Sequence, residues 1–312
     1  MKRIIPIIFL LFSISYAQAQ ITDAEKNLRT KPAADTTNGW KTGGLTNLNL
    51  SQTSFSHWAA GGDNSIAGNG LLSLFGNLKA GKSTWDNNLD IGYGLVQRTD
   101  QFKNTQIVKT DDKIDYNSKY GRMLIKNLYY AVFLSFKTQM SPGYAKPGDT
   151  IPISNFLSPG YIILAVGLDY QPNKHLALFL APVTGRITIV KDTLLSKKGS
   201  YGVTPGKHSR KEFGGYLRMT YKLDLMENVA LQAKADFFSN YLKNPQNIVV
   251  NSECLISMKV NKYIGATLGM TLIYDDAVKI KEPTETDPNR IVGPKIQFKE
   301  LLGIGFSYKF KS

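Results

Sequence analysis

The chain has 312 residues, of which 42% are hydrophobic, and it carries a formal net charge of +14 and a single cysteine. One cysteine excludes an internal disulfide and a multi-cysteine metal site. The basic residues are scattered without a long Lys/Arg run. The charge therefore favours a solvated surface, or contact with lipid phosphates and lipopolysaccharide, over a nucleic-acid partner.

The first residues predict export. Lys2 and Arg3 precede an apolar run over 4–16, and residues 17–19 (Ala-Gln-Ala) offer the small-x-small pattern that signal peptidase cuts. We expect a signal peptide over 1–19, in preference to an uncleaved anchor helix, and a flexible periplasmic lead-in over 20–42. No later segment supplies the roughly 20 continuous apolar residues of a membrane-spanning helix, which leaves a soluble exported β-protein or a β-barrel.

From residue 43 onward, apolar and polar side chains alternate in long runs. The run 84–98 sets Leu89 and Ile91 against Asn88 and Asp90. A period of two is the geometry of a strand, and these runs exceed the usual strand of about 5–6 residues. The predicted strands lie near 43–55, 65–80, 84–98, 107–120, 126–140, 159–171 and 174–190, four more within 211–276, and the last near 296–310.

The connections between these strands alternate in length. The short ones lie at 81–83, around Gly121, and at 172–173, 226–228 and 261–262. The longer ones lie at 56–64, 99–106, 141–157, 191–210 and 277–295, with a short exception at 243–246. This alternation is expected when one rim of a barrel faces the periplasm and the other the outside. It predicts an all-β fold: an antiparallel up-and-down transmembrane β-barrel of about 12 strands over 43–312, in the bacterial outer membrane.

The two faces of the strands predict two environments. One face is almost free of charge, as at Cys254 and Met270, and is expected to meet lipid, because a charge at mid-depth costs about 2–4 kcal/mol. The other face is expected to line the lumen with Asp86, Asp90, Lys137, Arg218, Lys222, Lys234, Asp236, Glu253 and Lys259. Aromatic side chains expected at the membrane interfaces include Trp85, Tyr130, Tyr161, Tyr241, Tyr263, Tyr274 and Tyr308.

The final strand adds a separate signal. From Gly303 to Phe310, aromatic residues alternate up to two residues before the end of the sequence. This pattern resembles the aromatic-ended strand that outer-membrane barrel-assembly machinery recognises, and we expect that machinery as a partner. Other envelope partners are not indicated by any motif.

The most irregular segment is the first long connection. It combines Phe55, His57, Trp58, Gly61 and Gly62. One interpretation is a loop that folds into the lumen as a plug or ligand contact. The favoured interpretation is a structural corner, in which the glycines supply positive φ and Trp58 anchors at the interface.

The same segment carries a family resemblance. The motif Gln-x-Ser-Phe-x-x-Trp-x-x-Gly-Gly over 52–62 resembles the signature of an exported Bacteroidota family known only as a domain of unknown function, the family numbered 3078. Further matches lie at 119–121, 182–186, 201–203, 238–241 and 273–275. The resemblance spans about residue 40 to the end of the sequence. It implies an outer-membrane barrel and implies no activity.

No group of residues predicts catalysis, a metal site or a cofactor. The three histidines, His57, His175 and His208, lack a serine or carboxylate partner at a suitable spacing. The acidic pairs 111–112 and 275–276 are interpreted as solvated rim charge rather than calcium ligands.

The function that follows is non-enzymatic. We expect a porin-like narrow pore, or a structural or accessory component of the envelope. The alternatives are an outer-membrane barrel hydrolase acting on lipid or peptide, with His208 or His57 as its base, and a soluble exported β-protein that binds an apolar ligand.

Overall fold

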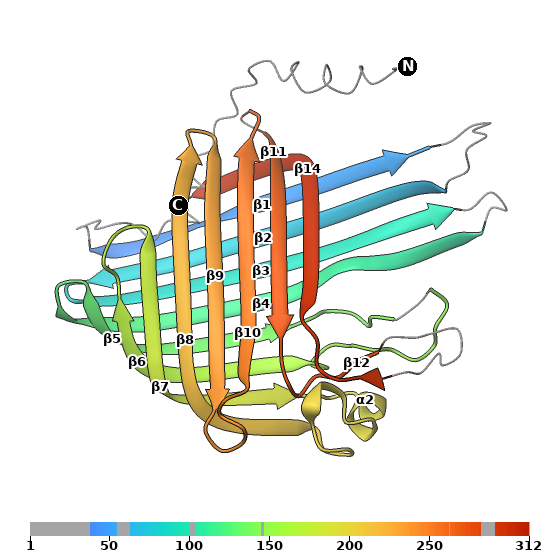
Figure 1. Ribbon diagram of the computed structural model, residues 1–312. Coiled ribbons are helices and arrows are strands. Elements are labelled where there is room, and N and C mark those ends of the chain that lie inside the picture. Colours follow the sequence, from blue (N-terminus) through green and yellow to red (C-terminus); the bar gives the residue numbers. More distant parts are fainter. Residues whose placement is uncertain are drawn as a thin grey trace, which may run out of the picture.

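Twelve antiparallel strands close into one barrel. The computed structural model describes residues 38–54, 63–99, 104–144, 147–261, 263–281 and 291–311. Around the barrel the strands follow the order β1-β14-β11-β10-β9-β8-β7-β6-β5-β4-β3-β2 (Figure 1). Each strand therefore pairs with its neighbours in the chain, and the first pairs with the last. The predicted up-and-down barrel of about twelve strands is confirmed.

The strands of the wall are long, as the alternating pattern indicates. They are β1 (Gly39–Thr53), β2 (Asn64–Ala80), β3 (Ser83–Thr99), β4 (Thr105–Ile125), β5 (Leu128–Thr138), β6 (Gly160–Tyr170), β7 (Leu176–Ile189), β8 (Ser209–Met226), β9 (Val229–Asn240), β10 (Ile248–Lys259), β11 (Ile264–Tyr274) and β14 (Gln297–Lys311). β1 begins before residue 43, so residues 39–42, expected in the lead-in, belong to the barrel wall. The expected leader over 1–19 lies outside the described residues.

One predicted turn is wrong. Gly121 was expected in a connection, but it lies inside β4, opposite Thr84 on one side and Ala131 on the other. A Cβ at this position would lie 3.3 Å from Oγ1 of Thr84, so the glycine permits close approach within the sheet. The chain turns later, at Lys126 and Asn127, where Asn127 adopts φ 65°. Asparagine enters this left-handed region more readily than most residues.

The two rims of the barrel differ. Short turns join β2 to β3, β4 to β5, β6 to β7, β8 to β9 and β10 to β11; we call this end the short-turn rim. The opposite end, the long-loop rim, carries the longer connections, which include the helix α2 (Thr193–Lys197), the 3-10 turn η2 (Ser200–Gly202) and the small hairpin β12 (Ile280–Lys281) and β13 (Ile291–Val292). In Figure 1, α2 and β12 lie together at this end. No helix in the described part of the chain has the length and apolar character to cross a membrane.

The outer face of the barrel is apolar. Leu164 is 53% exposed and Leu180 57%, although both sit in the middle of strands. Near the short-turn rim the exposed side chains become aromatic: Trp40, Trp85, Tyr120, Tyr130, Tyr170, Tyr263 and Tyr308. The rings of Trp40 and Trp85 lie 5.7 Å apart. An apolar band with an aromatic girdle is the surface that a membrane-spanning barrel presents to lipid.

Candidate functional site in the barrel interior

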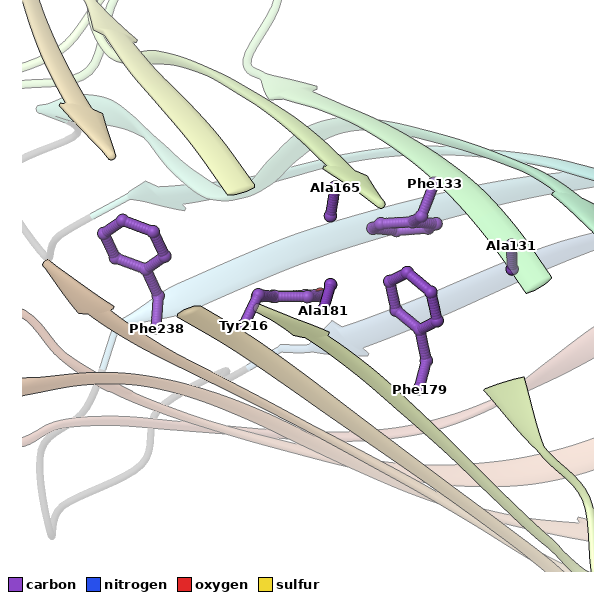
Figure 2. Close-up of a cluster of buried hydrophobic side chains, with 7 residues drawn as sticks. All are labelled: Ala131, Phe133, Ala165, Phe179, Ala181, Tyr216 and Phe238. Carbon is purple, nitrogen blue, oxygen red and sulfur yellow. The ribbon is translucent and has the colours of Figure 1, made fainter. Parts of the chain in front are cut away.

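Part of the interior is filled by apolar side chains. The inward residues of β5 to β9 include Ala131, Phe133, Ala165, Phe179, Ala181, Tyr216 and Phe238, each 3% exposed or less. Figure 2 shows the rings of Phe133 on β5, Phe179 on β7 and Tyr216 on β8 gathered together. Phe133 and Tyr216 are stacked with centroids 5.9 Å apart. We call this surface, formed by β5 to β9, the packed wall.

Arg218 connects the packed wall to β4 across the interior. Its Nε and Nη2 donate to the two carboxylate oxygens of Asp236, at 2.6 and 2.8 Å. Its Nη1 donates to Asn117 at 3.1 Å, and the guanidinium lies 4.3 Å from the centroid of Phe133. Because β8 and β4 are separated by three strands in the wall, the contact with Asn117 crosses the interior. The Tyr216 hydroxyl also donates to Asp236, at 2.8 Å.

Lys137 makes a second crossing. Its Nζ lies 3.3 Å from a carboxylate oxygen of Asp115 on β4 and 3.5 Å from one of Glu253 on β10. β5 and β10 lie far apart around the wall, so this ion pair also spans the interior. Lys119 adds a third bridge, with its Nζ 2.8 Å from Asp169 on β6. These charges are paired, as charges removed from water must be.

A separate ionic cluster lies toward the long-loop rim. Arg186 donates from Nη2 to Asp275 at 2.6 Å, and its Nη1 lies 3.4 Å from Glu212. Arg210 contacts the same two carboxylates, at 3.4 and 3.2 Å. Burial alone would raise the pKa of Asp275, but Arg186 and Arg210 hold it below the ordinary value of 3.8. The cluster ties β7 and β8 to the connection that follows β11.

The loops at this rim are fastened to one another. The Tyr201 hydroxyl donates to the carbonyl of Ile153 at 2.6 Å, and the Asp192 backbone N–H donates to the Ser158 hydroxyl at 2.8 Å. The carboxylate of Asp192 caps α2 by accepting from the N–H groups of Leu194 and Leu195. These hydrogen bonds lower the pKa of Asp192, and the one from the Leu195 N–H has the largest effect. The hydrogen bonds from Tyr201 and from the Asp192 backbone fasten the connections on either side of α2 to the segment 153–158 at the long-loop rim.

The rest of the interior has a different lining. The inward positions of β11, β14, β1, β2 and β3 are mostly small or polar: Gly265, Thr267, Gly269, Thr271, Gly303, Gly305, Asn47, Asn49, Asn69, Ser73, Asn88 and Asp90, interspersed with Leu45, Leu71 and Phe75. All the inward residues of β11 and β2 are partly exposed, unlike those of the packed wall. We call this surface the polar wall.

The charged residues expected in the lumen fall on five strands. They comprise Asp86 and Asp90 on β3, Lys137 on β5, Arg218 and Lys222 on β8, Lys234 and Asp236 on β9, and Glu253 and Lys259 on β10. Contacts bring together Lys137 with Glu253, and Arg218 with Asp236. Lys234 lies opposite Glu253 in the β9–β10 ladder, and Asp90 accepts from Asn88 at 2.9 Å. The plug candidates Phe55, His57, Trp58, Gly61 and Gly62 lie outside the described residues.

Some expectations about individual residues are wrong. Tyr161, expected at a membrane interface, faces inward, and its ring lies 5.6 Å from the Arg186 guanidinium. Asp275, expected as solvated rim charge, is 5% exposed and is paired with arginine. Asp111 and Asp112, also expected as solvated rim charge, have side chains 10% and 2% exposed and pair with Lys299 and Lys109. The contacts of Tyr161 and Asp275 do not follow from local sequence, because Arg186 comes from a strand far away in the chain.

Sequence reasoning also missed the packed wall. Its inward residues Ala131 and Phe133 are apolar at positions where the same face of their strand is otherwise polar. This interruption was the sequence signal that could have indicated apolar packing in the interior. The partners of the interior charges, Asp115, Asn117 and Asp169, were missed as well. They lie on strands whose polar parity is visible, but only the closed sheet shows which groups meet.

No catalytic arrangement emerges around the described histidines. Nδ1 of His208 lies 2.8 Å from the carbonyl oxygen of Val190, and Nδ1 of His175 lies 2.9 Å from that of Lys222. These contacts join each ring to the backbone rather than to a nucleophile. Across the described ranges, no group of three His, Cys, Asp or Glu side chains has the geometry to hold a metal ion.

The solved structures that resemble the chain include the following three. The COG4313 outer membrane channel from Pseudomonas putida F1 shares 14% identity over 88% of this chain and 96% of its own, with a TM-score of 0.38. The translocator domain of the autotransporter NalP from Neisseria meningitidis shares 9% over 89% and 90%, with a TM-score of 0.35. The toluene transporter TodX from Pseudomonas putida shares 9% over 88% and 89%, with a TM-score of 0.25. Among curated proteins, none matches the sequence.

The architecture and the family model agree with the sequence motifs. A closed barrel with a lipid-facing apolar band is how a β-sheet spans a membrane, and it indicates the bacterial outer membrane. Over residues 50–144, the chain matches the model of a family described as a protein of unknown function (DUF3078), the family that the motifs indicate.

Proposed function

We propose that this protein is a non-enzymatic barrel of the outer membrane that holds a narrow passage along its polar wall. The observation that carries the proposal is the contrast between the two parts of the interior. The packed wall is filled by rings and ion pairs, whereas the inward residues of β11 and β2 remain partly exposed. A twelve-strand barrel is small, so side chains that bridge its interior leave a narrow route.

The charges along this route have both signs. Lys137 and Glu253 form a pair whose side chains are 24% and 30% exposed, and Lys299 on β14 reaches Asp111 on β4 at 2.5 Å. We propose that these pairs, with the other inward charges on β3, β8, β9 and β10, border the route. Mixed signs favour weak selectivity between cations and anions.

Single-channel recording in planar lipid bilayers tests the passage. We expect small conductance steps and a reversal potential near zero in a salt gradient. The same preparation must show heat-modifiable migration on gels, which establishes that the barrel is folded. Folded protein that gives no steps would contradict the passage and would favour a structural or accessory role in the envelope.

Two partners accompany this proposal. We propose contact of the basic surface with lipid phosphates or lipopolysaccharide, and recognition of the strand from Gly303 to Phe310 by the barrel-assembly machinery. The outward exposure of Ile304, Phe306 and Tyr308 supports the second partner, because these side chains form an exposed row on one face of β14.

A further inference from the structure

The seam between β1 and β14 is only partly closed. β1 pairs with β2 along its whole length, and β14 pairs with β11 from Gln297 to Phe306. β1 and β14 pair with each other only from Gly43, opposite Lys311, to Asn49, opposite Gly305. Toward the long-loop rim, the strands continue without pairing across this seam. In Figure 1, β1 and β14 run in diverging directions beyond their paired part.

The unpaired edges carry free backbone groups. In the segments 50–53 and 297–304, the N–H and C=O groups directed at the seam have no ladder partner. Lipid tails offer no hydrogen bonds, so open sheet edges do not occur against hydrocarbon unless they line a water-filled cavity. Residues 51–54 and 297–300 are exposed at both parities, so neither face of these ends is covered. The seam is therefore accessible to water from the lumen.

The outer side of the seam is apolar around Leu50, Leu302 and Ile304, and Glu300 interrupts this face nearer the long-loop rim. Leu50 is 69% exposed on β1, and Ile304, Leu302 and Phe298 are 63%, 65% and 62% exposed on β14. These side chains belong to the lipid-facing parity of their strands. The unpaired stretch of β14 therefore lies at the depth of the apolar band, and a molecule in the membrane meets apolar flanks at this point.

The inner side of the seam is polar beside Asn47 and Asn49, and nearer the long-loop rim it carries Lys299, whose Nζ contacts Asp111. Asn49 lies opposite Asn69 in the β1–β2 ladder, and Asn47 follows on the same face. Oδ1 of Asn47, Oδ1 of Asn49 and Nδ2 of Asn69 are buried without a hydrogen-bond partner. Gly303 lies beside this group, since a Cβ there would meet the Asn49 amide. Buried amides without partners are rare and indicate a missing ligand or water.

We propose that the seam between β1 and β14 is a lateral opening that admits a neutral amphiphile between the membrane and the lumen. The apolar tail lies against Leu50, Leu302 and Ile304, and the hydrogen-bonding head reaches Asn47, Asn49 and Asn69. The inference rests on the proposed passage, because the head enters the lumen beside the polar wall. To the proposed passage it adds the class of molecule that enters, a neutral amphiphile, and the place where that molecule enters.

Two cysteine pairs test the geometry, in a Cys254→Ser background. The pair Leu48→Cys/Phe306→Cys lies in the paired part of the seam, and both side chains face outward. The pair Leu50→Cys/Ile304→Cys lies two residues farther along each strand, on the same face, where pairing has stopped. A disulfide needs Cβ atoms about 3.5–4.5 Å apart. We expect an oxidant to close the first pair and not the second, and a long bis-maleimide to bridge the second.

Dye uptake tests the route in intact Gram-negative cells. N-phenyl-1-naphthylamine is a neutral amphipathic dye that fluoresces on reaching phospholipid. Cells with the wild-type protein or with bridged Leu48→Cys/Phe306→Cys should take it up faster than cells without the protein. Bridging Leu50→Cys/Ile304→Cys should return uptake to the level of cells without the protein and leave planar-bilayer conductance intact. The variant Asn49→Leu should slow uptake without changing heat-modifiable migration.

The outcomes separate the opening from the passage. Oxidation that closes both cysteine pairs equally, or uptake that is unchanged after bridging, overturns the lateral opening. A polypeptide cross-linked to Leu50→Cys overturns it in favour of an inserted strand from a partner. If the folded wild-type protein gives no conductance steps but still supports dye uptake that bridging abolishes, the passage along the polar wall is overturned and the lateral opening is kept.

Discussion

Replacement of Arg218 by methionine is expected to destabilise the barrel by about 3–5 kcal/mol, the usual cost of removing one partner from a buried ion pair. The variant leaves the Asp236 carboxylate in the barrel interior without its bidentate guanidinium donor, and it removes the hydrogen bond to Asn117. Urea unfolding in lipid vesicles, followed by loss of the heat-modifiable gel band, measures the effect. The same variant should give larger conductance steps, because a bridge across the interior is gone.

The double variant Arg218→Met/Asp236→Leu is the matched control. Replacing both charges by apolar groups of similar volume is often neutral, so this variant should recover most of the lost stability. It should keep the larger conductance, because the bridge to Asn117 is still absent. An unchanged unfolding midpoint in Arg218→Met would show that the guanidinium does not hold the two sides of the interior together.

Acid is expected to loosen the cluster of Asp275 with Arg186 and Arg210 at the long-loop rim. The pKa of Asp275 lies below 3.8 in the folded protein, so the folded state binds fewer protons on this group than the unfolded state near that pH. Its contribution to stability is therefore complete above pH 3.8 and is lost as pH falls through the lowered value. The conductance should be steady from neutral pH down to pH 3.8 and should rise as the pH falls through the lowered pKa of Asp275, because Arg186 and Arg210 then lose one of the two carboxylates that they contact.

The variant Asp275→Asn should have, already at neutral pH, the higher conductance that the wild type shows only in acid. It should lose about 1.5–3 kcal/mol, the range for hydrogen bonds to charged groups, and its conductance should no longer change at low pH. Asp276→Asn is the matched control, because its carboxylate accepts from Asn247 and lies outside the arginine cluster. An acid response in Asp275→Asn as large as that of the wild type would contradict the role assigned to this cluster.

The strands of the barrel wall could be predicted because the patterns that indicate them lie within short stretches of the sequence. Alternation within a run shows a strand and its two faces, and connection length separates the two rims. β3 was expected at 84–98 and is found at Ser83–Thr99. Gly121 misled the prediction because a glycine marks either a turn or a close approach within a sheet, and composition alone does not separate the two.

The interior could be predicted only in part. The parity of Lys137 and Glu253 places both on the polar face of their strands, but their ion pair depends on the closure of the sheet. The register of β1 against β14 is set by no turn, because these strands lie at opposite ends of the barrel chain. The partly open seam therefore could not be predicted from the sequence, although both of its strands were predicted.

Thiol accessibility along β11 tests the central claim most directly, namely that the polar wall borders a water-filled passage. Single cysteines in a Cys254→Ser background are treated with a membrane-impermeant maleimide in lipid vesicles. Thr267→Cys and Thr271→Cys, which face inward, should react, whereas Leu268→Cys and Met270→Cys should stay unmodified in the lipid. Equal reaction at both parities, or no reaction at Thr267→Cys and Thr271→Cys, would contradict the passage.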